Sequence, residues 1–532
     1  MSMLVVLLFL LARPSAVDGA AAGSVGTLLR AALAAPDQAC RGFRLDGPGL
    51  ARFYSAASPR PLWVDEAGPG PRARQLRAVL ERADDDGLPP TRYGLASIEG
   101  HWDASAPAEL ACLDLMLTVA FECHARDLAM GWVAPQEGDR TWHLPRAAFD
   151  PVTTLQAMPP GADVREQLAK LAPAHSLYRR LRPALAHYRH LAEHGGWDTS
   201  LTGPRLKAGD EGEQIATLRE RLRPEGDLEP AASSSGRHFD AVLTDAVRRF
   251  QWRHGLLDDG IVGPRTLAAL NTTAAERVAQ LRRAMERLRW MPQDLGSHYV
   301  LVNTAAFELA VIEGDRSVLG MRIIVGTPDQ ATPSFTATLR SLVINPYWNV
   351  PLRIARDKLV PRERQSPGYL AAHGFRIFDA RTDRWREPDA TALAEAQVGD
   401  SGPRLRLRQE PGPGNLMGRL SFVFPNPYDV FLHDTPDRSL FERGIRACSE
   451  GCVRIERAMA LALHVLRRVP EWTEERIQRD IDALRHRVLT LPEPMPVYVV
   501  YLPTWVDDEG VVHFRPDHYR RESVLAGYFP GR

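Results

Sequence analysis

Two residues in the C-terminal part of the chain have the chemistry of a nucleophile and its base. Cys452 follows a short turn, Ser449-Glu450-Gly451, and His433 lies upstream of it. A free cysteine has a pKa of about 8.5, so a nearby imidazole is needed to take its proton and give a thiolate–imidazolium pair at neutral pH. Gly451 has no side chain, so a substrate carbonyl and backbone N–H donors can approach the sulfur closely. The residue types therefore predict covalent cysteine catalysis.

Other interpretations of the same residues stay open at this point. Cys448 and Cys452 could be zinc ligands, although no second Cys/His pair with ligand spacing follows them. They could also form a disulfide that blocks the nucleophile and acts as a redox switch. The plainest alternative is a structural cysteine and an unrelated histidine. Spacing alone does not choose among these alternatives.

The elements around these residues are predicted to form a β-rich fold with a few packed helices. Apolar and polar residues alternate along 307–311, and short apolar runs occur elsewhere, which is typical of strands. The predicted strands are 299–303, 307–311, 318–325, 341–345 and 428–432, with a turn at 313–315. His433 then ends a strand and can sit at a rigid sheet edge. Cys452 precedes an amphipathic helix, which is indicated by Ala458, Leu461, Ala462, Val465 and Leu466.

The stretch 353–418 is charged, rich in proline and glycine, and irregular. A long loop-like insertion inside a compact domain is usually functional, so we expect this one to act as a lid. A lid over the cleft would exclude water from the reaction.

The first part of the chain, 50–197, has mostly helical periodicity. Leu110, Leu113, Leu117 and Ala120 follow helical spacing while apolar residues fill the other faces, which predicts a buried helix. No ordered catalytic group stands out in this part. Its histidines lack a metal motif such as H-E-x-x-H, so we expect surface or core roles for His101, His124, His143, His175, His187, His190 and His194.

A compact segment of different character spans 205–271. Two apolar triplets at helical spacing, Ile215-Leu218-Leu222 and Leu243-Val247-Phe250, flank a polar loop at 230–237. Pro264 suits the first turn of a third helix. Three short helices around one small core are therefore predicted.

Length, charge and cysteine content set further bounds. The 532 residues suggest about three domains, and 66 basic residues balance 66 acidic ones, so no global field favours a nucleic-acid partner. The apolar run 3–12, followed by small residues at 20–22, predicts a signal peptide or else a retained membrane anchor. Five cysteines leave at least one thiol unpaired. Cys112 and Cys123 lie too far apart on one helix to pair, so no disulfide framework is expected.

The stretches around the two candidate residues resemble a known family. His433-Asp434-Thr435-Pro436 and Ser449-Glu450-Gly451-Cys452-Val453-Arg454 are similar to the signature of the L,D-transpeptidase (YkuD-type) catalytic domain, and Asn345-Pro346-Tyr347-Trp348-Asn349 supports the likeness. The stretches at 206–210, 246–251 and 259–267 resemble a peptidoglycan-binding module. Together with the helical first part, the chain resembles the multidomain type of this family.

This resemblance implies a multidomain α+β protein. The implied parts are a signal peptide or membrane anchor at 1–22, a helical scaffold domain at 40–200, a small three-helix peptidoglycan-binding module at 203–272, a β-rich catalytic domain at 285–505 with a capping insertion at 353–418, and a C-terminal extension at 506–532.

The resemblance also implies roles for the residues of the catalytic stretch. Cys452 would be the acylated nucleophile, and His433 would be the general base and later the general acid. Gly451 and its neighbours would supply the oxyanion donors. Ser449 would shape the turn or assist the histidine.

Four further residues would contact the substrate. Arg454 would anchor a carboxylate or order the site, Tyr347 and Trp348 would line the groove, and Asn345 would bind beside them. Glu450 is a departure, since many relatives have histidine at this position. A carboxylate here would oppose ionisation of the thiol if it faced the sulfur.

The implied reaction joins peptidoglycan stem peptides without a metal or an organic cofactor. The thiolate attacks the third residue of a tetrapeptide stem, D-Ala leaves, and an amine of a second stem resolves the thioester into a 3→3 cross-link. The implied location is the periplasm, with membrane contact only through the N-terminal segment and with cell-wall synthesis proteins as candidate partners. The alternatives are water as acceptor (an L,D-carboxypeptidase), a protein lysine (a lipoprotein ligase), or a catalytically silent wall-binding scaffold.

Overall fold

The computed structural model describes residues 24–531 apart from 35–39, 41–49, 55–59, 160, 198–200, 204, 230–235, 380–383 and 387–404. The predicted export segment at 1–22 lies outside the described residues. In the described part of the chain, no helix is both long and apolar enough to cross a membrane. The chain divides into two compact units, of which the first comprises 1–84, 88–128 and 149–171 and the second the remainder. The predicted multidomain α+β class is confirmed.

The first unit is helical and is organised around one long buried helix. Its main helices are α1 Val25–Ala34, α3 Leu50–Phe53, α4 Pro71–Glu81, α5 Leu95–Gly100, α6 Pro107–Met130, α8 Pro151–Gln156 and α9 Val164–Ala169. Helix α6 carries Asp114, which is fully buried and accepts hydrogen bonds from the backbone N–H groups of Leu62 and Trp63 and from the hydroxyl of Tyr54. Because a buried carboxylate needs such partners, Asp114 fixes the preceding segment on the helix.

Cysteine pairing in this unit differs from the expectation. Cys112 does not pair with Cys123, as predicted, but it forms a disulfide with Cys40. The distance along one helix excludes a disulfide between Cys112 and Cys123. It gives no information about a cysteine from a distant segment, such as Cys40. Cys123, Cys448 and Cys452 are free, so the predicted unpaired thiol is confirmed and the Cys448–Cys452 disulfide is absent from the structure.

The second unit begins with helices α10 Ser176–Glu193 and α14 Ala274–Arg289, which pack on each other. Between them in sequence lie three short helices, α11 Glu213–Leu222, α12 Ala241–Arg253 and α13 Pro264–Leu270, around a small apolar core. Asp240 caps α12 by accepting from the Leu243 N–H, and Pro264 opens α13. The predicted three-helix module is confirmed.

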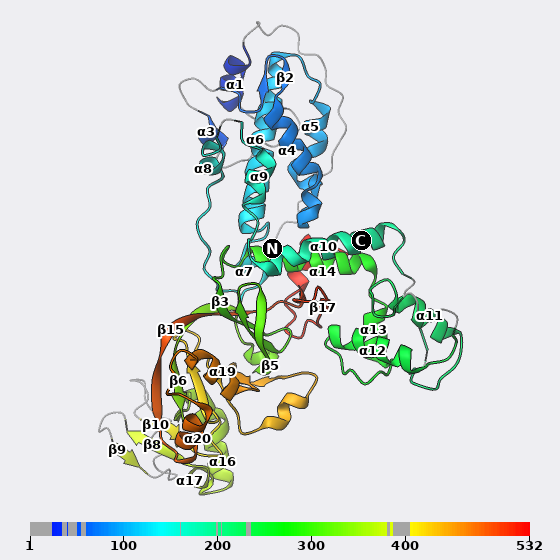
Figure 1. Cartoon of the computed structure of the whole chain (residues 1–532). Helices are drawn as coiled ribbons and strands as arrows, with labels where there is room; N and C mark the ends of the chain where they lie inside the picture. The colour runs from blue at the N-terminus through cyan, green and yellow to red at the C-terminus, as the bar shows by residue number, and fades with distance from the viewer. Residues whose placement is uncertain are drawn as a thin grey trace. The chain divides into compact units, whose positions relative to one another are not determined.

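A nine-stranded sheet forms the centre of the second unit (Figure 1). The strands are β3 His298–Asn303, β4 Glu308–Glu313, β5 Arg316–Gly326, β6 Phe335–Ile344, β11 Leu420–Val423, β12 Leu432–His433, β13 Ala447–Ser449, β14 Val453–Ile455 and β15 Arg487–Val500. Their order is β13-β5-β14-β12-β11-β6-β15-β3-β4, and β5 also pairs with β4. Helices α19 Ala458–Leu466 and α20 Glu474–Asp482 pack on its apolar core. The β-rich prediction holds, although 428–431 is loop rather than strand.

The insertion at 353–418 is not the irregular loop that was expected. With β7 Trp348–Asn349, its strands β8 Phe375–Asp379, β9 Arg384–Arg386 and β10 Leu405–Gln409 form a separate four-stranded sheet. Helices α15 Leu352–Ile354, α16 Val360–Gln365 and α17 Tyr369–Ala372 accompany it. It has its own core, which includes Leu359, Leu370, Phe375, Ile377 and Leu407. Frequent charges between these apolar residues hid the pattern in the sequence.

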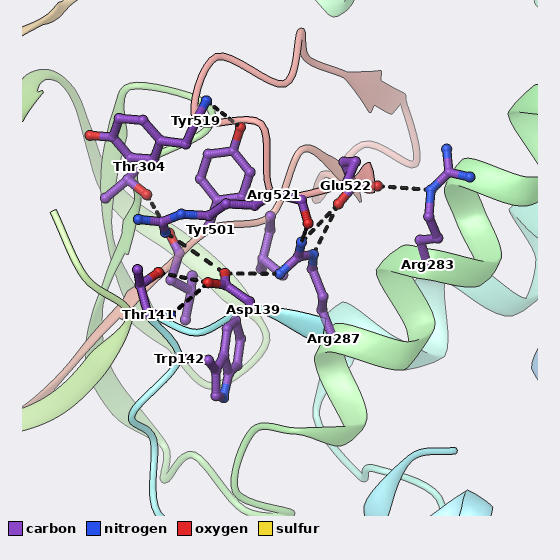
Figure 2. Close-up of polar contacts among 12 residues, drawn as sticks. Asp139, Thr141, Trp142, Arg283, Arg287, Thr304, Tyr501, Tyr519, Arg521 and Glu522 are labelled. Carbon is purple, nitrogen blue, oxygen red and sulfur yellow. Dashed lines mark hydrogen bonds and ion pairs between the residues drawn. The ribbon is translucent and has the colours of Figure 1, made fainter. Parts of the chain in front are cut away.

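The C-terminal segment folds back on the second unit through buried polar contacts (Figure 2). It contains β16 Thr504–Val506, β17 Val512–Phe514 and α21 Ser523–Tyr528. Arg287 of α14 is fully buried and donates to Glu522 and Asp139. A buried arginine requires such carboxylate partners, so the predicted extension at 506–532 is an integral part of the fold.

Candidate active site

Cys452 lies in a short loop between two strands of the large sheet. The loop follows β13 and leads directly into β14. The predicted helix is present as α19, which begins at Ala458, but β14 lies between it and Cys452. A helix dipole falls off within its first turn, so it does not act on the thiol here.

His433 is the last residue of β12, as predicted, and β12 runs parallel to β14. In this pairing Leu432 lies opposite Val453, and His433 lies opposite Arg454. Side chains alternate between the faces of a strand, so Cys452 and Arg454 share the face on which His433 lies. The pairing therefore brings Cys452 and His433 onto one face of neighbouring segments, which are joined by a hydrogen bond from the Val453 N–H to the Phe431 carbonyl.

His433 is buried and neutral in this structure. Burial lowers its pKa to about 4, and the positive charge of Arg454 acts in the same direction. Its Nδ1 atom lies 2.6 Å from the backbone carbonyl oxygen of Asp434. A carbonyl can only accept, so this contact requires a proton on Nδ1, and the backbone of Met417 also favours the protonated ring.

Cys452 is held as a thiol rather than as a thiolate. Burial raises its pKa, which the Phe431 backbone and Arg454 offset only in part, while Asp429 adds to the increase. The sulfur lies 3.6 Å from the carbonyl oxygen of Asp429. Burial thus disfavours both charges of the expected thiolate–imidazolium pair.

The loop itself is fixed by Ser449 and by a glycine conformation. The Ser449 hydroxyl donates to the Cys452 carbonyl at 2.6 Å and accepts from the Gly451 N–H at 3.1 Å. Gly451 has a φ of 116°, which side chains rarely permit. Ser449 occupies the Gly451 N–H, whereas the Cys452 N–H has no hydrogen-bond partner among the described residues.

A second support for the loop comes from segments that sequence reasoning did not connect with the site. Fully buried Thr332 donates from Oγ1 to the Gly451 carbonyl at 2.8 Å and accepts from the Gly326 N–H. Tyr519 donates to the Gly326 carbonyl, and Arg521 to the Thr332 carbonyl (Tyr519 and Arg521 are in Figure 2). The C-terminal segment thereby supports the loop before Cys452, and no local sequence pattern indicates this contact.

Replacing Thr332 with valine keeps the shape of this side chain but removes the hydrogen bond to Gly451. We expect acylation of Cys452 to slow by about tenfold, because a lost buried hydrogen bond costs about 1–3 kcal/mol and misplaces the loop. The acylation rate constant measures this, and Thr332→Ser, which keeps Oγ1, should retain most of the rate. Equal losses in both variants would mean that the hydroxyl does not position the loop.

Glu450 points to the inserted sheet-and-helix region. It forms ion pairs with Arg353 of α15, at 2.9 Å, and with Lys358 of the π-helical turn η4 Ala355–Leu359. Burial acts to raise the pKa of Glu450, but Lys358 and Arg353 together hold it below its usual value. Its charge is therefore compensated by the insertion.

The four predicted substrate-binding residues have different environments. The guanidinium of Arg454 has no ion-pair partner in the part of the chain that the structure describes. Tyr347 stacks under Arg408 and beside His486, and Trp348 contacts Phe375 in the inserted core.

Asn345 is used within the fold. It is 1% exposed, and its amide nitrogen donates to the carbonyls of Asp480, Ile481 and Arg485 at the end of α20. These carbonyls belong to the last turn of α20 and to the residues just after it. The side chain thus anchors α20 and offers no donor to a substrate.

Comparison with known proteins assigns families to three segments. Residues 297–477 match the model of the L,D-transpeptidase catalytic domain (YkuD), residues 211–270 that of a "putative peptidoglycan binding domain", and residues 48–185 that of a "scaffold domain". A "Putative L,D-transpeptidase" of Haemophilus influenzae is 31% identical over 234 residues, which are 44% of this chain and 46% of that protein. The chain thus spans about half the length of the curated relative that it matches.

Two solved structures of L,D-transpeptidases were also found. The one from Xylanimonas cellulosilytica is 14% identical and covers 56% of this chain and 98% of its own, with a TM-score of 0.17. The one from Stackebrandtia nassauensis is 13% identical and covers 56% and 94%, with a TM-score of 0.20. At TM-scores this low, neither likeness bears on the function of this chain.

Proposed function

We propose that this chain, whose residues 297–477 form an L,D-transpeptidase catalytic domain, forms 3→3 cross-links between peptidoglycan stem peptides through a thioester on Cys452. The observation that carries the proposal is the pairing of β12 with β14, which sets His433 and Cys452 on one face of adjacent strands inside that domain. Each residue type matches its role in acyl transfer by a cysteine and a histidine.

The reaction runs in two acyl-transfer steps. As Cys452 Sγ attacks the carbonyl of the third stem residue, Nε2 of His433 takes the thiol proton. The imidazolium then gives this proton to the leaving D-Ala amine, and the C–N bond breaks to leave the thioester. An amine of a second stem attacks the thioester, His433 takes its proton, and the thiol is restored when the C–S bond breaks. The Cys452 N–H stabilises the oxyanion in both steps.

Arg454 is the substrate anchor in this proposal. It lies opposite His433 in the strand register, and its guanidinium has no carboxylate partner among the described residues. A stem peptide carries free carboxylates, and a guanidinium binds a carboxylate through two parallel hydrogen bonds. Its positive charge also lowers the pKa of Cys452, so a bound carboxylate would raise that pKa again.

The remaining parts fit a protein that acts in the cell wall. The three-helix segment at 203–272 matches a peptidoglycan-binding model over 211–270 and would hold the enzyme at its polymeric substrate. Peptidoglycan lies outside the cytoplasm, so the proposed location is the periplasm, reached through the segment at 1–22.

An assay with purified muropeptides tests the proposal. The full-length protein is incubated with tetrapeptide-rich muropeptides, and the products are separated and weighed by mass spectrometry. We expect 3→3 dimers and free D-Ala, both absent with Cys452→Ala. Tripeptides without dimers would assign water as acceptor and make the protein an L,D-carboxypeptidase. Unchanged muropeptides with wild-type protein would contradict the proposal.

Loss of the Glu450 carboxylate is expected to shift the products toward hydrolysis. Glu450→Gln removes the charge that pairs with Arg353 and Lys358, so the insertion is held less firmly near the loop. Two half-exposed pairs are worth about 1 kcal/mol together, so the ratio of tripeptide to dimer should rise by about fivefold. Glu410→Gln, which removes the partner of Arg408 in the same insertion, is the matched control. Equal ratios in all three proteins would show that the ion pairs do not affect water exclusion.

A further inference from the structure

Three side chains converge outside the site described above. Nε2 of His298 lies 3.0 Å from Nε2 of His464, and Oε1 of Glu313 lies 3.6 Å from the first nitrogen and 3.7 Å from the second. Within the described part of the chain, this is the one group of histidine, cysteine and carboxylate side chains whose ligand atoms come so close together. All three side chains are partly buried.

Their positions are set by three separate elements. His298 opens β3 and Glu313 closes β4, and the two residues lie directly opposite each other in the antiparallel pairing. His464 comes from the last turn of α19, which packs over the sheet. Side chains of a cross-strand pair on one face lie close together, so the backbone itself directs the imidazole and the carboxylate to one point.

The 3.0 Å between the two imidazole nitrogens suits a hydrogen bond, but Oε1 of Glu313 lies too far from both nitrogens for one, and all three distances suit a shared metal ion. A point equidistant from the three atoms lies about 2 Å from each, which is the length of a Zn–N or Zn–O bond. Two imidazole nitrogens and one carboxylate oxygen are a common ligand set for this ion, with water as the fourth ligand. We propose that His298, Glu313 and His464 form a binding site for a divalent transition-metal ion, with Zn²⁺ as the best fit.

Arg467 competes with the metal ion for this site. Its Nη1 atom donates to Glu313 and lies 3.0 Å from Nε2 of His464, so the guanidinium now supplies the positive charge. The side chain is 38% exposed and long, and an ion pair of this kind contributes little. Arg467 can therefore turn to solvent when the metal binds, at the expense of some affinity.

The site would join α19 to the first residue of β3 and the last residue of β4. Helix α19 follows β14, the strand that leaves the Cys452 loop. A metal ion held by the helix and by both strands would stabilise this packing rather than take part in acyl transfer. The proposal does not depend on the proposed reaction.

Zinc titration of the full-length protein tests the site. A Cys448→Ala/Cys452→Ala background removes the thiols of the catalytic loop as competing ligands, and affinity tags are removed. Isothermal titration calorimetry should show one saturable Zn²⁺ site, and zinc should raise the melting temperature. His298→Ala and His464→Ala should each weaken this binding by at least tenfold while keeping the metal-free circular dichroism spectrum. Unchanged binding in both variants would overturn the proposal.

The Arg467→Met variant distinguishes a metal-binding site from a cluster that only forms hydrogen bonds. Removal of the competing guanidinium should tighten Zn²⁺ binding by about tenfold, whereas a cluster that exists for hydrogen bonding would only lose stability. Co²⁺ gives a second readout, since a tetrahedral His₂Glu site produces visible absorption bands that His464→Ala should abolish. A folded Arg467→Met protein that binds neither ion would also overturn the proposal.

Discussion

Cys452→Ser is expected to lower turnover of a tetrapeptide stem by at least about 10³-fold, since replacement of a nucleophile removes the covalent route. Serine retains the shape but has a hydroxyl that His433 cannot deprotonate at a useful rate, because burial lowers the pKa of the imidazole to about 4. Release of D-Ala measures the effect.

Cys448→Ser is the matched control for this substitution. Cys448 lies in β13 of the same stretch and is also a free thiol. We expect its turnover to stay within a fewfold of wild type. If Cys448→Ser lost activity and Cys452→Ser kept it, the assignment of the nucleophile would be wrong.

His433→Gln is expected to slow acylation of Cys452 by about 10²–10⁴-fold at neutral pH, which is the range for loss of a general base. The pKa of Cys452 lies above its usual value, so without His433 little thiolate forms. The rate of the variant should therefore rise about tenfold per pH unit into the alkaline range. Glutamine keeps a polar group of similar size in the strand.

The pH dependence of the acylation rate in the wild-type protein tests the lowered pKa of His433. Because the pKa of His433 is lowered to about 4, its neutral form persists far below the ordinary histidine value. The acylation rate should then stay nearly constant between about pH 5 and 7 and fall only as the pH approaches 4. A loss of half the rate near pH 6.5 would mean that the histidine titrates normally and that burial does not set its charge.

The sequence predicted those helices and strands that short patterns of apolar and polar residues define. The apolar spacing of Ile215, Leu218 and Leu222 gave one helix of the three-helix module, and alternation along 307–311 gave β4. The motif around Cys452 and His433 predicted an L,D-transpeptidase catalytic domain, and residues 297–477 match that family model. In these stretches each residue depends mainly on neighbours a few positions away.

Features that depend on distant segments were not predictable in this way. The pairing of Cys40 with Cys112, the support of Gly451 by Thr332, and the contacts of Arg521 all join residues far apart in the chain. The charges of Cys452 and His433 depend on burial, which spacing does not reveal. The inserted sheet was missed because its apolar residues are separated by charged ones.

The most direct measurement of the central claim is covalent labelling of the full-length protein with a carbapenem, followed by peptide mapping. A carbapenem acylates an activated cysteine and leaves a stable mass increase. We expect one adduct on the peptide 447–454, located on Cys452 by fragmentation, present in Cys448→Ala and absent in Cys452→Ala. An adduct that persists in Cys452→Ala, or a wild-type protein that is never labelled, would contradict the assignment of Cys452 as the nucleophile.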